Sequence, residues 1–404
     1  MHGDGAGAGQ GKGFRAFRGG TIRMTADRGL TGSTEMISRR TFGKTVGKGA
    51  ATASAAALST ACSPAVSVDH HEPRPAADRG TRRPAAEPSF GPLKQVRAGV
   101  LNVGYAEAGP AHGPAVLLLH GWPYDIHSYV AVAPLLAAKG YRVIVPYLRG
   151  HGTTRFLSST AFRNAQQSVF ALDILALMDA LRIDKAILAG YDWGSRTADI
   201  IAALWPQRVR GLVSVGGYLI TDRAANKQPL PPKLEWAWWY QFYFATERGR
   251  LGLERNRREL ARLIWTFNSP TWHFDAATFA RTAAAFSNPD YVRIVLHNYR
   301  WRLGLAEGDP RYDGLERRLA EGPVITVPTI TLDGADDPFT PAGGGSSYRD
   351  KFRGRSAHRT LKGVGHNVPQ EAPEAFARAV VDVAEAAGVV GADGLGTVER
   401  RPGK

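Results

Sequence analysis

Asp192 is the residue whose type and setting most clearly suggest chemistry. It is the middle residue of a GYDWG segment, 190–194, between an apolar run at 185–189 and a helix-like stretch at 195–204. A strand, a tight glycine turn and a helix in this order expose the middle side chain, and the glycines avoid collisions with neighbouring elements. A carboxylate has a pKa of about 3.9 in water, so it is ionised at neutral pH without a base. Asp192 is therefore suited to displace a leaving group from a saturated carbon and to form an alkyl ester.

Two residues near the end of the chain could complete a catalytic set. Asp337 lies in the turn GADDP at 334–338, and His366 lies in GVGHN at 363–367. Each follows a strand-like run, and open α/β sheets build their sites at the carboxyl ends of their strands. We predict that His366 is the general base for the water that cleaves the ester, and that Asp337 orients it. Asp336 is the alternative to Asp337, which is preferred because such acids commonly stand fourth in the turn.

The segment HGWP, residues 120–123, also follows a buried, strand-like run. We predict that the backbone amides of Trp122 and Trp193 form an oxyanion hole for the tetrahedral intermediate of ester hydrolysis. The indole rings of the same two tryptophans are predicted to line the substrate pocket. His120 is interpreted as structural.

The order of elements predicts the fold class. Strand-like runs at 114–120, 141–146, 185–189 and 209–215 alternate with helix-like stretches, the first of them at 128–139. This order indicates an α/β fold with a mostly parallel sheet and helices on both faces. Strand-like runs return at 324–332 and 358–361, before an amphipathic helix at 373–387. The chain order nucleophile, acid, histidine is typical of the α/β-hydrolase fold. We predict a core made of 93–217 and 323–390, with a helical cap, rich in aromatics and arginine, inserted at 218–322.

The N-terminal region has a different composition. Residues 1–61 hold nine Lys and Arg against three Asp and Glu, a net charge of +6 out of +15 for the whole chain. Within them, SRRTFGK at 38–44 precedes a mildly apolar, Ala-rich stretch and resembles a twin-arginine export signal. Periplasmic or other extracytoplasmic localisation is therefore expected, with a disordered basic tail as the alternative. Residues 62–92 are interpreted as a Pro- and Ala-rich linker, and 391–404 as a C-terminal tail.

Several other classes of function are disfavoured. Cys62 is the only cysteine among 404 residues, so an intramolecular disulfide is excluded and Cys62 is a candidate for lipid anchoring. The remaining charge of +9 forms no basic stripe interleaved with aromatics, so nucleic-acid binding is not expected. The sequence contains no run of 18 uncharged apolar residues, so a multispan membrane protein is not expected. The histidines have no ligand spacing, so we assign no metal and no cofactor.

The aspartate turn, HGWP and two segments of the cap together resemble the epoxide hydrolases of the α/β-hydrolase fold, over about Val96 to Gly388. In that family two cap tyrosines donate hydrogen bonds to the epoxide oxygen. The resemblance implies these roles for Tyr240, in YQFYF at 240–244, and for Tyr299, in NYR at 298–300. The second match lacks the tryptophan that usually stands between the asparagine and the tyrosine. Tyr243 is predicted to contact the substrate.

The resemblance implies hydrolysis of a small apolar epoxide to a vicinal diol without a cofactor. The first alternative is a haloalkane or haloacid dehalogenase with the same triad, because Trp193 offers an indole N–H for a halide, although Trp122 replaces the usual asparagine. The second alternative is a non-catalytic binding protein that kept the fold. A serine esterase is disfavoured because Ser195 lies beyond the turn, inside the helix.

Overall fold

The structure is a computed structural model that describes residues 89–339 and 345–389. The predicted export motif, Cys62, the linker as far as residue 88 and the C-terminal tail lie outside the described residues. In the part of the chain that is described, no helix is both long and apolar enough to cross a membrane.

A nine-stranded sheet forms the centre of the described region. Its order is β1-β2-β4-β3-β6-β7-β8-β9, with β5 paired to β2. The pairs made by β2 are antiparallel, and every pair from β4 to β9 is parallel. The strands are β1 (Lys94–Ala98), β2 (Leu101–Ala108), β3 (Ala115–Leu119), β4 (Arg142–Pro146), β5 (Arg155–Phe156), β6 (Ala186–Gly190), β7 (Val209–Val215), β8 (Thr329–Gly334) and β9 (Ser356–Leu361).

Helices connect and flank these strands. The α-helices are α1 (Val132–Ala137), α2 (Gln167–Ala180), α3 (Trp193–Leu204), α4 (Pro232–Ala237), α5 (Trp239–Ala245), α6 (Glu247–Asn268), α7 (Ala276–Ala283), α8 (Tyr291–Arg302), α9 (Asp313–Ala320), α10 (Val368–Glu371) and α11 (Pro373–Ala386). The 3-10 helices are η1 (Ile126–Tyr129), η2 (Pro206–Arg208), η3 (Ala225–Lys227), η4 (Ala284–Ser287), η5 (Pro310–Tyr312) and η6 (Arg349–Lys351).

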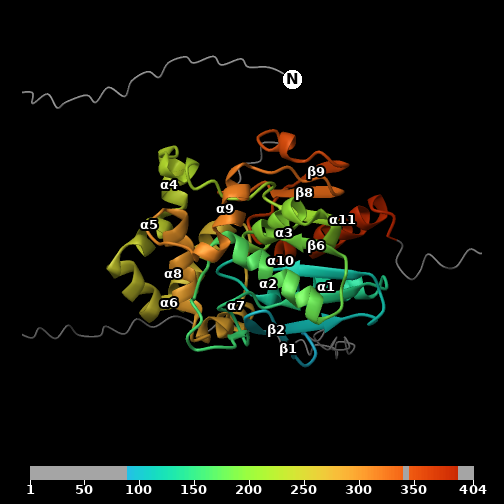
Figure 1. The fold of residues 1–404 in the computed structure, drawn as a ribbon, viewed down its shortest axis with the longest axis horizontal. Helices are drawn as coiled ribbons and strands as arrows, with labels where there is room; N and C mark the ends of the chain where they lie inside the picture. Colours follow the sequence, from blue (N-terminus) through green and yellow to red (C-terminus); the bar gives the residue numbers. More distant parts are fainter. Residues whose placement is uncertain (1–88, 340–344, 390–404) are drawn as a thin grey trace, which may run out of the picture. The chain divides into compact units, whose positions relative to one another are not determined.

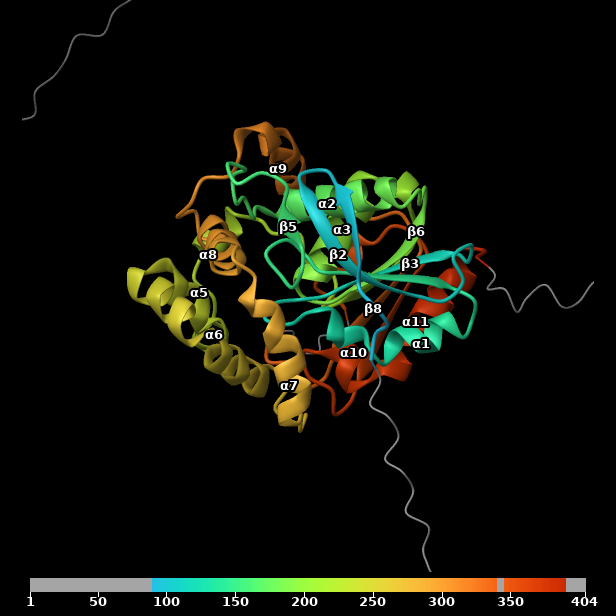
Figure 2. The same ribbon diagram turned by 90° about the horizontal axis from the view of Figure 1, so that it is seen from below.

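Helices cover both faces of the sheet. The pair α1 and α11 packs on one face and the pair α2 and α3 on the other, as Figures 1 and 2 show from two directions. All residues of β3 and β6 are buried, which agrees with their nearly unbroken apolar sequences and with a parallel sheet covered on both sides. The strands therefore form a rigid layer whose carboxyl ends can hold loops in place.

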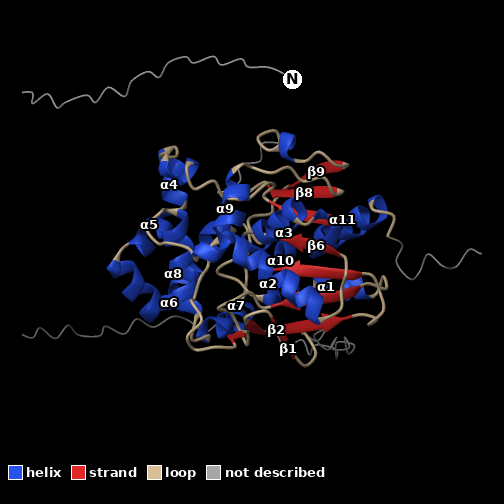
Figure 3. Ribbon diagram, in the orientation of Figure 1, coloured by secondary structure: helices blue, strands red, loops and turns tan. Residues whose placement is uncertain are grey.

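The helices α4 to α9 lie in the chain between β7 and β8, and we refer to them as the helical insertion. Figure 3 separates them in colour from the strands, and Figures 1 and 2 both show α5, α6 and α8 beside one end of the sheet. The insertion is largely helical and occupies the region where the sequence lost its strand signals.

Two expected elements differ from the structure. The strand expected from residue 324 begins at Thr329, and before it only Ile325 makes an isolated bridge, to Phe352. Pro328 has no amide hydrogen to donate to a strand ladder, which explains the late start. The helix expected at 128–139 is divided into η1 and α1. Pro134 is tolerated only near a helix start, so α1 begins two residues before it.

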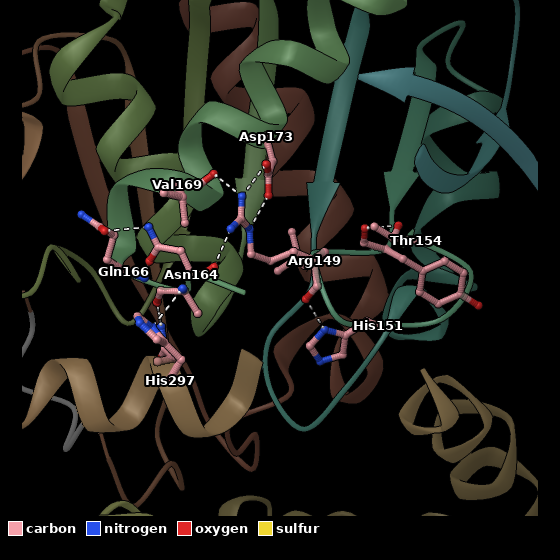
Figure 4. Close-up of polar contacts among 12 residues, drawn as sticks. Arg149, His151, Thr154, Asn164, Gln166, Val169, Asp173 and His297 are labelled. Carbon is pink, nitrogen blue, oxygen red and sulfur yellow. Dashed lines mark hydrogen bonds and ion pairs between the residues drawn. The ribbon is translucent and has the colours of Figure 1, made fainter. Parts of the chain in front are cut away.

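The loop that follows β4 is held by a buried ion pair. Arg149 donates from Nε and Nη2 to the two carboxylate oxygens of Asp173 in α2, at 2.6 and 2.7 Å. Its guanidinium also donates to the carbonyl oxygens of Asn164 and Val169, and Figure 4 shows it pointing toward these groups. Because Arg149 is only 4% exposed, these acceptors take the place of the water that its charge would otherwise bind.

The far end of this loop is bonded to α8. The amide of Ala165 donates to Nδ1 of His297, and the side-chain amide of Asn298 donates to the Ala165 carbonyl, at 3.0 and 2.8 Å. Figure 4 shows His297 at the lower end of the same network. The Arg149 network therefore fixes the position of the helix that carries Tyr299.

Replacing Asp173 with alanine should destabilise the protein by about 3–5 kcal/mol, because it leaves the Arg149 charge buried without its carboxylate. Chemical denaturation monitored by circular dichroism measures this change. Asp179→Ala is the matched control on the same helix, since Asp179 pairs with Arg208 but its side chain is 66% exposed. An exposed pair contributes about 1 kcal/mol or less. Equal losses for the two variants would contradict this account of the loop.

Candidate active site

Asp192 lies in the turn between β6 and α3 in a strained backbone conformation. Its φ of 53° and ψ of −121° belong to a region that non-glycine residues rarely adopt, at a cost of about 1–3 kcal/mol. The surrounding packing maintains this strain. A side chain at Gly194 would place its Cβ 1.9 Å from the carbonyl oxygen of Leu119 in β3, so α3 can approach the sheet only with glycine there. The structure thus has the strand, turn and helix that were predicted around Asp192.

The loop after β3 binds one oxygen of the Asp192 carboxylate. The backbone amide of Trp122 donates to Oδ1 at 2.7 Å. Trp193 is the first residue of α3, directly after Asp192, so its amide belongs to the same helix start. His120 is fully buried, donates from Nδ1 to the Gly121 carbonyl and accepts the Leu148 amide at Nε2. These bonds are consistent with the structural role expected for His120.

The other carboxylate oxygen of Asp192 faces His366. Nε2 of His366 lies 3.6 Å from Oδ2, an ion-pair distance that is long for a hydrogen bond. On the other side of the ring, Nδ1 donates to Oδ2 of Asp337 at 2.8 Å. Asp337 is therefore the acid that is hydrogen-bonded to His366, while Asp336 accepts a hydrogen bond from Thr271.

The charges around Asp192 and His366 shift the pKa values of these two residues. Burial opposes charge on His366, but the charges of Asp337 and Asp192 outweigh it and raise its pKa to about 10. Burial would likewise raise the pKa of Asp192, yet His366 and the Trp122 amide hold it below its usual value. At neutral pH the site therefore contains a carboxylate nucleophile candidate beside an imidazolium.

The helical insertion brings two tyrosines to the same place. Tyr240 of α5 and Tyr299 of α8 are 7% and 1% exposed, and their ring centroids lie 5.4 Å apart. The ring of Trp122 contacts both, at 5.4 and 5.2 Å between centroids, and Trp193 contacts Tyr299 at 5.8 Å. Burial and then nearby charges, including that of Asp192, raise the pKa of both tyrosines, so both keep their protons at neutral pH.

The two tryptophan indoles differ in their hydrogen bonding. Nε1 of Trp122 donates to the hydroxyl of Tyr291 in α8 at 2.9 Å. Nε1 of Trp193 is buried and has no hydrogen-bond partner within the described residues. Of the two indole N–H groups, that of Trp193 has no acceptor in hydrogen-bond geometry among the residues that the structure describes, although it is near enough to Tyr299 to lower the pKa of that tyrosine slightly against the effect of burial.

Tyr243 lies apart from the residues gathered around Asp192. Its ring contacts are with Trp239 and Phe244, and its hydroxyl lies so close to Gly252 of α6 that a side chain there would collide with it. The predicted substrate contact therefore does not join the group in this structure. Its position three residues after Tyr240 would allow both rings on one face of α5, but the Tyr243 ring packs on Trp239 and Phe244 instead.

Comparison with known proteins identifies the family. The model of the alpha/beta hydrolase fold family matches residues 114–373. The chain belongs to the α/β-hydrolase fold family. A crystal structure of a candidate epoxide hydrolase from Klebsiella pneumoniae subsp. pneumoniae is 60% identical, with a TM-score of 0.71, and covers 72% of this chain and 97% of its own.

Curated relatives of this α/β-hydrolase are matched over shorter stretches. Epoxide hydrolase 2 of Siraitia grosvenorii is 37% identical over 127 residues, or 31% of this chain and 39% of the relative. Haloalkane dehalogenase of Mycobacterium marinum is 35% identical over 127 residues, or 30% of this chain and 41% of the relative. The chain thus spans about two fifths of the length of these relatives. The predicted fold class and the resemblance to epoxide hydrolases are confirmed.

Some residues of this α/β-hydrolase site could not be found by motif. Tyr291 positions the Trp122 indole, and Phe339 places its ring 5.2 Å from that of His366. Neither stands in a segment with a recognisable spacing, although Phe339 follows the GADDP turn closely. Among residues 89–339 and 345–389, no group of three or more His, Cys, Asp and Glu could hold a metal ion.

Replacing Asp192 with asparagine should lower the pKa of His366 below its value of about 10. The reason is that one of the two carboxylates that favour the imidazolium is removed, while burial and Asp337 remain. Titration of the imidazole by NMR measures the change, and Asp336→Asn is the control because Asp336 does not touch the ring. An unchanged His366 pKa in the Asp192 variant would show that the two side chains are not coupled.

Proposed function

We propose that this chain hydrolyses epoxides to vicinal diols through an ester on Asp192, and that the helical insertion is a cap over the site. The observation that carries the proposal is the position of Trp122. Its amide binds Asp192, while its ring contacts Tyr240 and Tyr299, so nucleophile and proton donors surround one residue. The epoxide hydrolases among its relatives add support.

The first step forms the ester. Oδ1 of Asp192 is held by the Trp122 amide, which leaves Oδ2 to attack a ring carbon of the epoxide. The carbon–oxygen bond of the ring breaks, and the electron pair goes to the oxygen, which takes a proton from Tyr240 or Tyr299. A phenol with a pKa of about 10 or higher can protonate an alkoxide, which is far more basic. The tyrosine is left as a tyrosinate.

Ester formation also prepares His366 for the second step. The ester carries no charge, so one of the two carboxylates that raise the pKa of His366 is lost. The imidazolium can then release its proton, and the tyrosinate is one proton short. Proton transfer between them, through solvent, restores the tyrosine and leaves His366 neutral and able to act as a base.

The second step hydrolyses the ester. His366 takes a proton from water, and the hydroxyl oxygen attacks Cγ of Asp192 while Asp337 stabilises the imidazolium. The charge of the tetrahedral intermediate develops on Oδ1, where the amides of Trp122 and Trp193 are proposed as donors. The intermediate collapses, and the departing diol oxygen takes the proton back from His366.

The surroundings favour an apolar substrate. A groove of about 460 Å³ opens beside Pro338, and its lining consists of Lys233, Trp236, Ala237, Leu263, Thr266, Phe267, Pro270 and Pro338. The ring of Phe339 contacts both Phe267, at 6.4 Å, and His366, at 5.2 Å. A substrate whose apolar part extended from His366 past Phe339 would therefore meet the aromatic and aliphatic side chains of this groove.

Dehalogenation by the same triad is the second candidate. It is favoured by the Trp193 indole N–H, which is buried without a partner in the described part of the chain and could receive a halide. A second donor is lacking at Trp122, because its indole N–H is already bonded to Tyr291. A haloalkane dehalogenase is among the relatives.

Export and lipid anchoring remain part of this proposal. They are supported by the SRRTFGK motif and by Cys62 after an Ala-rich stretch, both of which lie outside the described residues.

His366→Gln should form the ester but hydrolyse it very slowly, because the base for water is missing. Incubation with a panel of epoxides, followed by mass spectrometry of the peptide that contains Asp192, should show the added mass of the substrate. Asp192→Asn, freshly prepared, should show neither adduct nor diol. In a single turnover of the wild type in H₂¹⁸O, the label should enter Asp192 and not the diol; a labelled first diol would rule out the ester.

Tyr240→Phe combined with Tyr299→Phe should slow the opening of epoxides by about 10²–10⁴-fold, because the alkoxide then forms without a general acid. Rapid-quench measurement of ester formation tests this step alone. A haloalkane serves as the control substrate, since a halide leaves without a proton. Unimpaired epoxide opening in the double variant would contradict the proton-donor roles, and turnover of haloalkanes only would favour dehalogenation.

A further inference from the structure

The loop that carries His366 is bonded on both sides of the histidine to one carboxylate, that of Glu371 at the end of α10. Oε2 of Glu371 accepts the amide of Gly365 at 2.7 Å, and Oε1 accepts the amide of Asn367 at 2.9 Å. The amide of His366 itself donates to the carbonyl of Asn268 at 3.1 Å. Three consecutive amides therefore have fixed acceptors, and the backbone around His366 has little freedom to rotate.

The same carboxylate connects this loop to the helical insertion. The hydroxyl of Ser269, directly after α6, donates to Oε1 of Glu371 at 2.6 Å. The backbones are also close together, because a Cβ at Gly365 would lie 2.6 Å from Cα of Ser269 and 2.8 Å from the Asn268 oxygen. The C-terminal end of α6 and the His366 loop are thus packed as one unit.

A carboxylate is the side chain that this arrangement requires. The Gly365 amide, the Asn367 amide and the Ser269 hydroxyl are all donors, and an ionised carboxylate offers acceptors on both oxygens. A glutamine offers one acceptor oxygen, and its NH₂ group would face at least one of the amides, donor against donor. The carboxylate of Glu371 therefore holds the loop through hydrogen bonds from these three donors.

We propose that Glu371 is a positioning residue for His366, and that it aligns the imidazole for hydrolysis of the ester on Asp192. Ser269 extends this support to the helical insertion. The proposal rests on the function proposed above, in which His366 acts only in the second step. Attack of Asp192 on the epoxide needs no base, so a displaced His366 loop should slow ester hydrolysis and leave ester formation intact.

The test measures the two steps separately in Glu371→Gln. We expect ester formation, measured by rapid quench, to proceed at the wild-type rate. Ester hydrolysis should be slower by about 10²-fold, which is the effect of displacing a reacting group by about 1 Å. The alkylated Asp192 peptide should accumulate. Glu374→Gln is the matched control, since it makes the same change three residues later at an exposed position and should leave both rates unchanged.

Ser269→Ala provides a second variant should Glu371→Gln fail to fold. It removes one of the three donors, so ester hydrolysis should slow several-fold with ester formation unchanged. Hydrolysis at the wild-type rate in the folded variants, or equal slowing of both steps, would overturn the positioning role.

An NMR measurement makes the outcome independent of substrate. The proton of His366 that bonds Asp337 should give a low-field signal in the wild type that is lost or shifted in Glu371→Gln and retained in Glu374→Gln. If the wild type forms no ester with any epoxide, the proposed function fails, and this signal still tests whether Glu371 positions the ring. An unchanged signal in Glu371→Gln would overturn the proposal.

Discussion

The negative charge of the partly buried Asp192 carboxylate is the constraint on which the rest of the site depends. A carboxylate removed from water is stable only when hydrogen bonds or an opposite charge replace its hydration. Here the Trp122 amide binds one oxygen, and the imidazolium of His366 faces the other. Asp337 in turn compensates the charge on His366. The three residues therefore share one electrostatic balance, and a change of charge at Asp192 must be felt at the histidine.

This arrangement requires an unfavourable backbone conformation at Asp192. Asp192 has a positive φ, which is unfavourable for a residue with a side chain, and the close approach of α3 to the end of β3 keeps it there. Strain of this kind is tolerated only where the surrounding structure is rigid, and the fully buried strands β3 and β6 supply that rigidity. The sheet acts less as a source of functional groups than as the support that fixes their directions.

Among the hydrogen bonds that join the helical insertion to this support, three reach the surroundings of the site. The Trp122 indole is bonded to Tyr291, the loop held by Arg149 is bonded to α8 at Asn298, and Ser269 is bonded to Glu371. Each connection ends next to a group of the proposed mechanism. The insertion therefore holds Tyr240 and Tyr299 in fixed positions, which suits the proton-donor roles proposed for them.

The sequence by itself determined the order of strands and helices, the turn that presents Asp192, and the loop of His366, because apolar runs and glycine turns act locally. The sequence favoured Asp337 and left Asp336 as an alternative, because adjacent residues differ mainly in the direction of their side chains. In the structure the side chain of Asp337 is hydrogen-bonded to His366. Tyr243, predicted as a substrate contact, packs away from Asp192 in the structure, and Glu371 stands in no motif that the sequence offers. Which residues meet depends on how α5, α6 and α10 pack, and packing joins segments that no spacing along the chain relates.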